Sequence, residues 1–404
     1  MSVNNKKLEY NRKIHILSLS ATKFGDGLVD PKLVLAWLLN SLGAGLFWVG
    51  LLVPVREAGA LLPQLFTANY LRRVRIRKWW WVIGSLVQGV AVLAIALVGL
   101  NFTGNLAGLL IIFSLSVFAI ARSICSVSYK DVMGKTVEKP KRGLVTGTAS
   151  SVAAFGVLLF GLLLMFGVIE QRLLVFLALF LASFLWLIAG WQFSSLREEE
   201  SEISVSNDES VIKMYFGYLT KDAELQKFLV VRALLTATAV APPFLILLAE
   251  SETASLLSQL GGLVVASSFA TFLSGRIWGS LSDRSSSMVL ALSGLASTVF
   301  LIIALGGASA GWYNSSWFLP VILFGVMVSY QGVRIARSVH LVNLANEKTR
   351  AAYTAISNTI IGVVLLATGL FGLLAEVSGV QMVVWFLVGM SLLGGLISFS
   401  LENP

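Results

Sequence analysis

The chain is poor in the residues that build disulfides and metal sites. Its 404 residues include one cysteine, Cys125, and two histidines, His15 and His340. No intrachain disulfide and no cluster of histidine and cysteine ligands can therefore form, and we expect neither a metal ion nor another cofactor. Charged residues make up only 13% of the chain, against about 25% in a typical soluble domain. This deficit places the protein in the membrane class.

The chain is correspondingly rich in apolar residues. Hydrophobic residues make up 56% of the chain, and its 36 glycines suit helices that pack closely in lipid. A bilayer core of about 30 Å requires roughly 20 mostly apolar residues per helix. By that measure we expect twelve spans, near residues 14–35, 46–70, 79–100, 106–128, 143–168, 173–193, 228–249, 260–281, 288–310, 317–341, 351–375 and 380–401. Asp30-Pro31-Lys32 interrupts the first span near its outer end.

Basic residues gather on one side of these spans. Segments 1–13, 70–78 and 130–142 are strongly basic, whereas the opposite loops hold little beyond Lys32 and Arg172. The positive-inside rule then places both termini in the cytoplasm, and an even number of spans agrees. We therefore expect a multi-pass protein of a bacterial inner membrane. The net charge of +9 reflects this orientation in a lipid bilayer and not a nucleic-acid partner.

One long hydrophilic segment divides the chain. Residues 194–226 include Glu198-Glu199-Glu200 and are rich in serine, asparagine and aspartate, which is typical of a solvated cytoplasmic tether. We predict an N-terminal six-helix bundle at 1–193, a linker at 194–226 and a C-terminal six-helix bundle at 227–404.

The two halves repeat one another at a nearly constant offset. The fourth span ends in Ala121-Arg122-Ser123-Ile124, and the tenth ends in Ala336-Arg337-Ser338-Val339. The loop after the eighth span, from Gly279 to Arg284, corresponds to Asn69-Tyr70-Leu71-Arg72-Arg73 after the second. Parallel repeats of this kind build several transporter folds.

The sequence Gly279-Ser280-Leu281-Ser282-Asp283-Arg284 is similar to the major facilitator signature Gly-x-Leu-Ala-Asp-Arg. The resemblance implies an all-α fold of two six-helix bundles related by a pseudo-two-fold axis, acting as a monomer. It also implies that the glycine lets helices approach and that the aspartate pairs with basic residues in a cytoplasmic gate. The gate residues implied in this way are Gly279, Asp283, Arg284, Arg72, Arg73, Arg142 and Arg337. The sequence departs from the pattern at Ser285-Ser286-Ser287, which replaces Gly-Arg-Lys, and at Asn69, where an acid is expected.

Arg122 resembles an arginine found at this place in many proton-coupled members of that family. The Gln-Gly that follows it in those proteins is replaced by Cys125-Ser126. The fifth span also lacks the Gly-Pro of the antiporter signature, which disfavours a drug–proton antiporter.

Four charges lie inside the first two spans: Lys23, Asp26, Arg56 and Glu57. Such groups usually face a partner or a cavity. We expect a neutral network in which Lys23 pairs with Glu57 and Asp26 with Arg56. In the functional interpretation Asp26 or Glu57 takes up a proton and releases a cation to bind an anionic substrate group. In the alternative the network is a permanent structural cluster.

Further polar residues lie in the second half. Tyr330, Gln331 and Asn358 are candidates for the wall of a cavity, or for hydrogen bonds between helices. We expect the arginines near the cytoplasmic face to extend to the lipid headgroups: Arg232, Arg276, Arg334 and Arg337. Pro242-Pro243 is expected to bend or break the seventh span near its outer half.

These features favour a secondary active transporter that moves a small solute by alternating access. The excess of basic residues within the spans favours an organic anion, and protons are the expected coupling ion. No His–Asp pair or phosphate-binding glycine loop supports an enzyme. The alternatives are a lipid translocase on the same fold, a membrane-embedded lipid-modifying enzyme and a non-transporting sensor.

Overall fold

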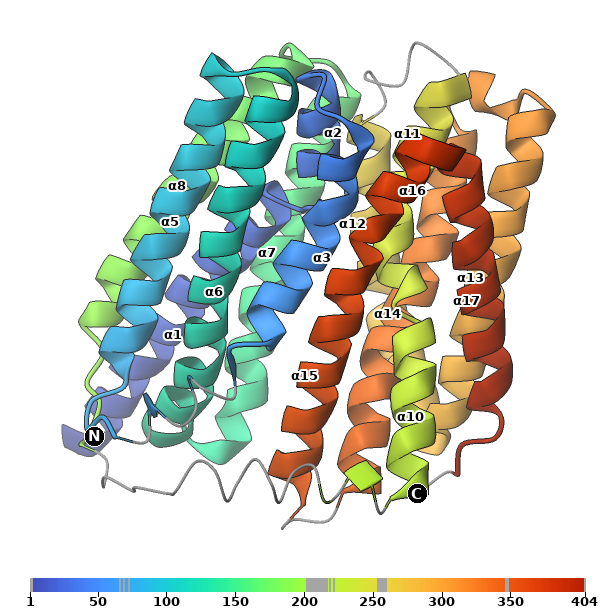
Figure 1. Ribbon diagram of the computed structural model, residues 1–404. Helices are drawn as coiled ribbons and strands as arrows, with labels where there is room; N and C mark the ends of the chain where they lie inside the picture. The colour runs from blue at the N-terminus through green and yellow to red at the C-terminus, as the bar shows by residue number, and fades with distance from the viewer. Residues whose placement is uncertain are drawn as a thin grey trace.

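The computed structural model describes residues 3–64, 67, 70–71, 73–200, 217, 219–220, 222–252, 260–345 and 349–402. Within these ranges the structure is helical and contains no strand. The helices stand side by side as one bundle, with both chain ends at the same end of it (Figure 1). We call this the terminal end and the opposite one the far end.

The helices of the first half of the chain, blue to green, lie on the left of the bundle, and those of the second half, yellow to red, lie on the right (Figure 1). The first half comprises α1 (Val3–Leu28), α2 (Val34–Ser41), α3 (Leu46–Leu61), α5 (Lys78–Asn101), α6 (Gly104–Thr136), α7 (Arg142–Met165) and α8 (Gln171–Ser194). The second comprises α10 (Ala223–Leu234), α11 (Ala237–Glu252), α12 (Leu260–Arg284), α13 (Ser286–Ser309), α14 (Phe318–Leu344), α15 (Arg350–Thr368), α16 (Leu370–Ser378) and α17 (Val380–Ser398).

Most of these helices match a bilayer in length and composition. Among the described residues nine are long and apolar enough to cross one, and the bent pair Leu260–Gly275 and Ile277–Arg284 makes a tenth. The first two expected spans fall short of this measure, because α1 begins in the polar N-terminal segment and α3 has only 16 residues. The membrane class is supported, and the number of twelve spans stays a prediction.

The expected interruption of the first span is confirmed, but its place in the molecule differs from the prediction. The Asp30 carboxylate accepts the backbone N–H groups of Lys32 at 2.8 Å and Leu33 at 3.1 Å, which satisfies donors freed between α1 and α2. The break lies inside the apolar core, since Leu28 and Val34 around it are buried. Lys32, expected in an outer loop, is only 5% exposed.

The seventh span is also broken, though not at its prolines. The chain leaves the helix at Leu235 and Thr236, between α10 and α11, whereas Pro242 and Pro243 lie inside α11. A proline frees the carbonyl of the residue four positions before it, so the strain falls on the first turn of α11, next to the break. The predicted position was therefore wrong by about two turns.

The acidic start of the predicted tether is bound to the first half. The buried Glu198 side chain, 0% exposed, accepts the backbone N–H groups of Arg77 at 3.2 Å and Lys78 at 2.7 Å at the start of α5. Glu199 accepts a hydrogen bond from Lys7 at 2.8 Å, which lowers the pKa of its carboxyl group. The expectation of a solvated tether is wrong for Glu198, whereas Glu199 and Glu200 are exposed. Residues 201–216 lie outside the described ranges.

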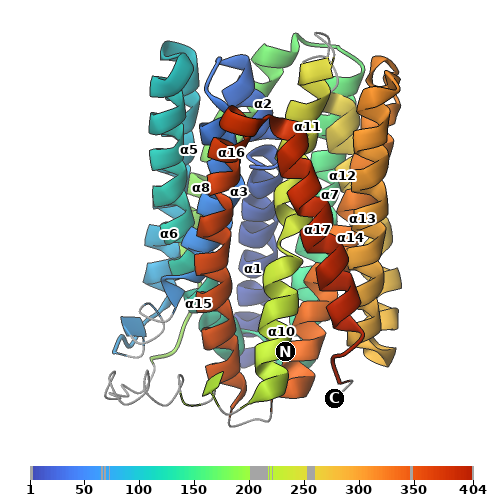
Figure 2. The same ribbon diagram turned by 45° about the vertical axis from the view of Figure 1, so that its right-hand side comes forward.

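Glycines bring the two halves together at the far end. Figure 2 shows α15 and α16 running beside α3. A Cβ atom added at Gly50 would lie 2.6 Å from the Cα atom of Gly372, and one added at Gly372 would lie 2.8 Å from the Cα atom of Phe47. Glu376 in α16 accepts the N–H of Phe47 at 3.0 Å. The backbones of α3 and α16 are thus in direct contact.

This contact predicts the effect of a single methyl group. Gly372→Ala should destabilise the protein by about 1–3 kcal/mol, the usual cost of overpacking, because the neighbouring atoms are backbone and cannot rotate away. The matched control is Gly389→Ala in α17, where an added Cβ meets no atom within 4 Å. Thermal unfolding in detergent should show a lower midpoint for the first variant only. Equal midpoints would contradict the contact.

Candidate functional site

Three helices of the first half converge on Asp26. Its Oδ1 atom lies 3.0 Å from Nη2 of Arg56 on α3, and Arg122 on α6 pairs with its other oxygen. All three side chains are partly buried: 22% of Asp26, 14% of Arg56 and 29% of Arg122 is exposed. The predicted Asp26–Arg56 pair is confirmed, and Arg122 joins it, so one carboxylate is shared by two guanidinium groups.

The second predicted pair is wrong. Lys23 donates to the hydroxyl of Ser150 on α7 at 2.5 Å and forms no ion pair with Glu57. The physical reason is the direction of each side chain. Glu57 follows Arg56 and points about 100° away from it around α3, so it faces α10 and α14 and not α1.

Glu57 lines a cavity between the two halves. Its other polar lining residues are Arg232, Thr236 and Thr238 from α10 and α11, and Tyr330, Arg334 and Arg337 from α14. The cavity encloses about 20 Å³, enough for about one water molecule. An organic solute therefore enters only if the helices around it move apart.

Arg232 is the most buried of the cavity's arginines, at 6% exposed. Its Nη2 atom donates to the Asn358 side-chain oxygen at 3.0 Å, and Nη1 donates to Ser357. Its Nε–H is buried and has no hydrogen-bond partner among the described residues. The expectation that Arg232 extends to the headgroups is wrong, because these neutral partners on α15 hold it inside the bundle.

Asn358 also joins the two halves, since its amide nitrogen donates to the side-chain oxygen of Gln64 at 3.1 Å. Tyr330 reaches across in the other direction: the ammonium group of Lys32 lies 3.3 Å from the centre of its ring. Gln331 instead donates to Thr271 on α12 at 2.8 Å. Of the three polar candidates, Tyr330 lines the cavity, Asn358 supports its wall through Arg232, and Gln331 links helices away from it.

The structure does not bring the predicted gate residues together. Asp283 and Arg284 are exposed and form no ion pair with another described residue. An added Cβ at Gly279 would meet nothing within 4 Å, so this glycine permits no close helix approach here. Arg142 donates to the carbonyls of Val137 at 3.1 Å and Gly134 at 2.5 Å, at the end of α6.

The other gate residues that the structure describes are dispersed as well. Arg337 lines the cavity. The N–H of Arg73 donates to the carbonyl of Tyr70 in a turn before α5, and Arg72 lies outside the described residues. A cytoplasmic gate of the expected composition stays a prediction.

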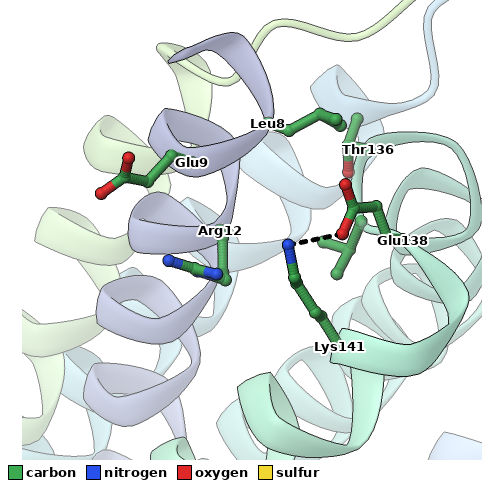
Figure 3. Close-up of a pocket in the computed structure, with 7 residues that line it drawn as sticks. Leu8, Glu9, Arg12, Thr136, Glu138 and Lys141 are labelled. Atoms are coloured by element: carbon green, nitrogen blue, oxygen red, sulfur yellow. Dashed lines mark ion pairs between the residues drawn. The ribbon is translucent and has the colours of Figure 1, made fainter. Parts of the chain in front are cut away.

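A larger pocket of about 230 Å³ lies at the terminal end, between α1 and the connection from α6 to α7 (Figure 3). Its charged residues are balanced, with Arg12 and Lys141 against Glu9 and Glu138. Lys141 and Glu138 pair at 2.6 Å across it. Its position away from the buried charges and its lack of net charge make it a poor solute site.

Sequence reasoning missed three cationic residues of the central region: Lys32, Arg232 and Arg334. One signal was available for the arginines. The segment 225–249 contains no acidic residue, and neither does 318–344, so an arginine there has no local partner and is a functional candidate by default. No such signal marks Lys32, because its burial depends on how the broken first span packs against α14.

No protein-family model and no curated protein matches the sequence. Several solved structures, however, are similar to the structure of this chain. The nucleoside transporter NupG is similar with a TM-score of 0.71 and 14% identity, over 97% of this chain and 99% of that one. A POT family transporter in complex with 5-aminolevulinic acid has a TM-score of 0.72 at 11% identity, over 96% and 95% of the two chains.

The xylose transporter XylE from E. coli gives a TM-score of 0.67 at 12% identity, over 96% of this chain and 95% of that one. The chain has the major facilitator fold. The predicted fold class is thereby confirmed, and at such low identity the likeness concerns the fold alone. Within this major facilitator fold, Asp26 and its arginines lie in the first half, and the cavity lies between the halves.

The shared carboxylate predicts a stability effect. Asp26→Asn leaves Arg56 and Arg122 without their charged partner and should destabilise the protein by about 1–3 kcal/mol. The control Glu138→Gln breaks an exposed pair and should cost about 0–1 kcal/mol. In thermal unfolding in detergent, adding Arg122→Gln to Asp26→Asn should recover part of the loss, because it removes an uncompensated charge. The prediction fails if Asp26→Asn unfolds like the control.

Proposed function

We propose that this protein is a secondary active transporter that moves a small organic anion across a membrane by alternating access, with protons as the coupling ion. The observation that carries the proposal is that one major facilitator fold holds both a partly buried carboxylate shared by two arginines and a basic cavity between the halves. In this proposal residues 1–193 and 227–404 are the two bundles that rock against each other, and 194–226 connects them.

The charge of the cavity supports an anionic solute. Three arginines and one glutamate line it: Arg232, Arg334, Arg337 and Glu57. Arg232 is buried, Arg337 is partly buried and Arg334 is exposed. This excess of positive charge in a cavity raises the local concentration of anions. Lys32 adds a further positive charge nearby, within electrostatic range of Glu57.

Asp26 is the group we assign to proton coupling. Protonation removes its negative charge, so Arg56 and Arg122 lose the partner that holds α3 and α6 against α1. Two like charges then remain in an apolar region, which favours a rearrangement of these helices. Arg56 and Glu57 are neighbours on α3, so a movement of this helix reaches the cavity as well. In this way a change in the charge of Asp26 shifts the equilibrium between two arrangements of these helices.

The contacts at the far end support a direction of access. Gly50 and Gly372 bring the two halves together there, so the cavity is expected to be entered from the terminal end in this state. With both termini in the cytoplasm, this is an inward-facing conformation. We propose that the protein is a monomer of a bacterial inner membrane and that it is not an enzyme.

Transport in proteoliposomes tests the proposal. The panel contains labelled carboxylates, phosphate esters, sugars and nucleosides, the last two because of the structural neighbours. The wild type should accumulate an anion under a proton gradient. Asp26→Asn should lose this accumulation and keep exchange of solute without a gradient, because its fixed neutral side chain cannot titrate. Glu138→Gln should behave like the wild type.

Two outcomes would contradict the proposal. If Asp26→Asn accumulates the solute at the wild-type rate, a residue other than Asp26 couples transport to protons. If no solute moves and a fluorescent lipid crosses the bilayer instead, the protein is a lipid translocase on this fold.

A further inference from the structure

The arginines of the two halves differ in their charged partners. In the first half Arg122, the second residue of the repeated motif, shares Asp26 with Arg56. In the second half Arg337 has the same place in the matching motif, but segments 225–249, 318–344 and 350–368 contain no aspartate or glutamate. The motif arginine thus occurs in both halves, but these segments of the second half hold no carboxylate that corresponds to Asp26.

The guanidinium group of Arg232 has no anionic partner among the described residues. It is 6% exposed, its two terminal nitrogens bond only to neutral groups, and its buried Nε–H has no partner among the described residues. The charged side chain that acts on it is Arg337, which has the same sign. A guanidinium in this position costs free energy that an oxyanion would offset through charge-assisted hydrogen bonds.

Glu57 is the one carboxylate in the lining of this cavity. It lies within electrostatic range of Arg334 and Arg337, yet it forms no ion pair with either among the described residues. Its oxygens are therefore open to a donor from a solute. One face of the Tyr330 ring, in contrast, is already covered by the ammonium group of Lys32, so that face does not offer a stacking platform for a base or sugar.

We propose that Arg232, Arg334 and Arg337 bind the oxyanion of the transported solute, and that Glu57 accepts a hydrogen bond from a hydroxyl or amino group on it. The solute is then a small carboxylic acid or phosphate ester that carries a hydrogen-bond donor. This assignment rests on the proposed function, since it names the substrate class of the same cavity. It adds Arg232 and Arg334 as binding residues.

Binding in detergent tests the site without requiring transport. The probes are inorganic phosphate, glycerol 3-phosphate, malate and succinate, and the readouts are calorimetry and thermal stabilisation. Malate and succinate differ by the hydroxyl group that Glu57 would accept. At least one oxyanion should bind the wild type, and the preferred probe distinguishes a phosphate site from a carboxylate site.

The variants have separate expected results. Arg334→Gln and Arg337→Gln should each weaken binding by about tenfold or more, as expected for the loss of a hydrogen bond to a charged group. Arg232→Gln should do the same, but it also removes bonds to α15, so Arg334→Gln decides if that variant does not fold. Glu57→Gln should keep oxyanion binding and reduce the preference for malate over succinate. Arg172→Gln is the control and should bind like the wild type, because Arg172 lies in the first turn of α8, at the far end of the bundle.

The results separate the two proposals. If all three arginine variants bind like the wild type, the assignment is wrong and the transporter proposal stands. If no oxyanion binds while the proteoliposomes transport another solute, the assignment and the anionic substrate are both wrong, and only the proposal of a transporter stands. If the arginine variants lose binding and the wild-type proteoliposomes move nothing, the anion site is supported and the transporter proposal fails.

Discussion

A charge inside an apolar bundle must find a partner of opposite sign or a polar cavity, because burial removes the water that would otherwise solvate it. Asp26 meets this constraint by taking two arginines at once, from α3 and α6. The arrangement fixes where α1, α3 and α6 meet, and it leaves one proton-accepting group between two positive charges. Any change in the charge of Asp26 is therefore also a change in how three helices pack.

The duplicated architecture makes the second half a natural comparison for the first. Both halves carry an arginine at the same place in the repeated motif, Arg122 and Arg337. In the first half a carboxylate of the chain itself compensates the charge, whereas in the second the arginines face a cavity with Glu57 as its carboxylate. An ion pair held within one bundle is independent of solute, and an unpaired cluster between bundles is sensitive to it. In the proposed function, this asymmetry divides the roles of coupling and binding between the halves.

The all-helical membrane fold can be predicted from the sequence, because hydropathy and basic-residue placement depend on the bilayer and not on tertiary detail. The Asp26–Arg56 pair follows from the charges of two neighbouring spans. The burial of Lys32 and the neutral partners of Arg232 do not follow. They depend on where α1 and α10 break and on how each broken end packs against the other half. Residue types near a helix break are readable from sequence, but the direction of the chain after the break is set by packing.

In the proposed anion site, Arg232 connects solute binding to the contact between the halves. Its partner Asn358 also donates to Gln64 of the first half, so one amide bonds to both a cavity arginine and the opposite bundle. A ligand can shift a conformational equilibrium only through a difference in its affinity for the two states. An oxyanion that draws the guanidinium of Arg232 toward itself competes with its bond to Asn358 and leaves that amide free to turn. The bridge to Gln64 then weakens when the cavity is occupied, which gives binding a direct means of loosening the two halves.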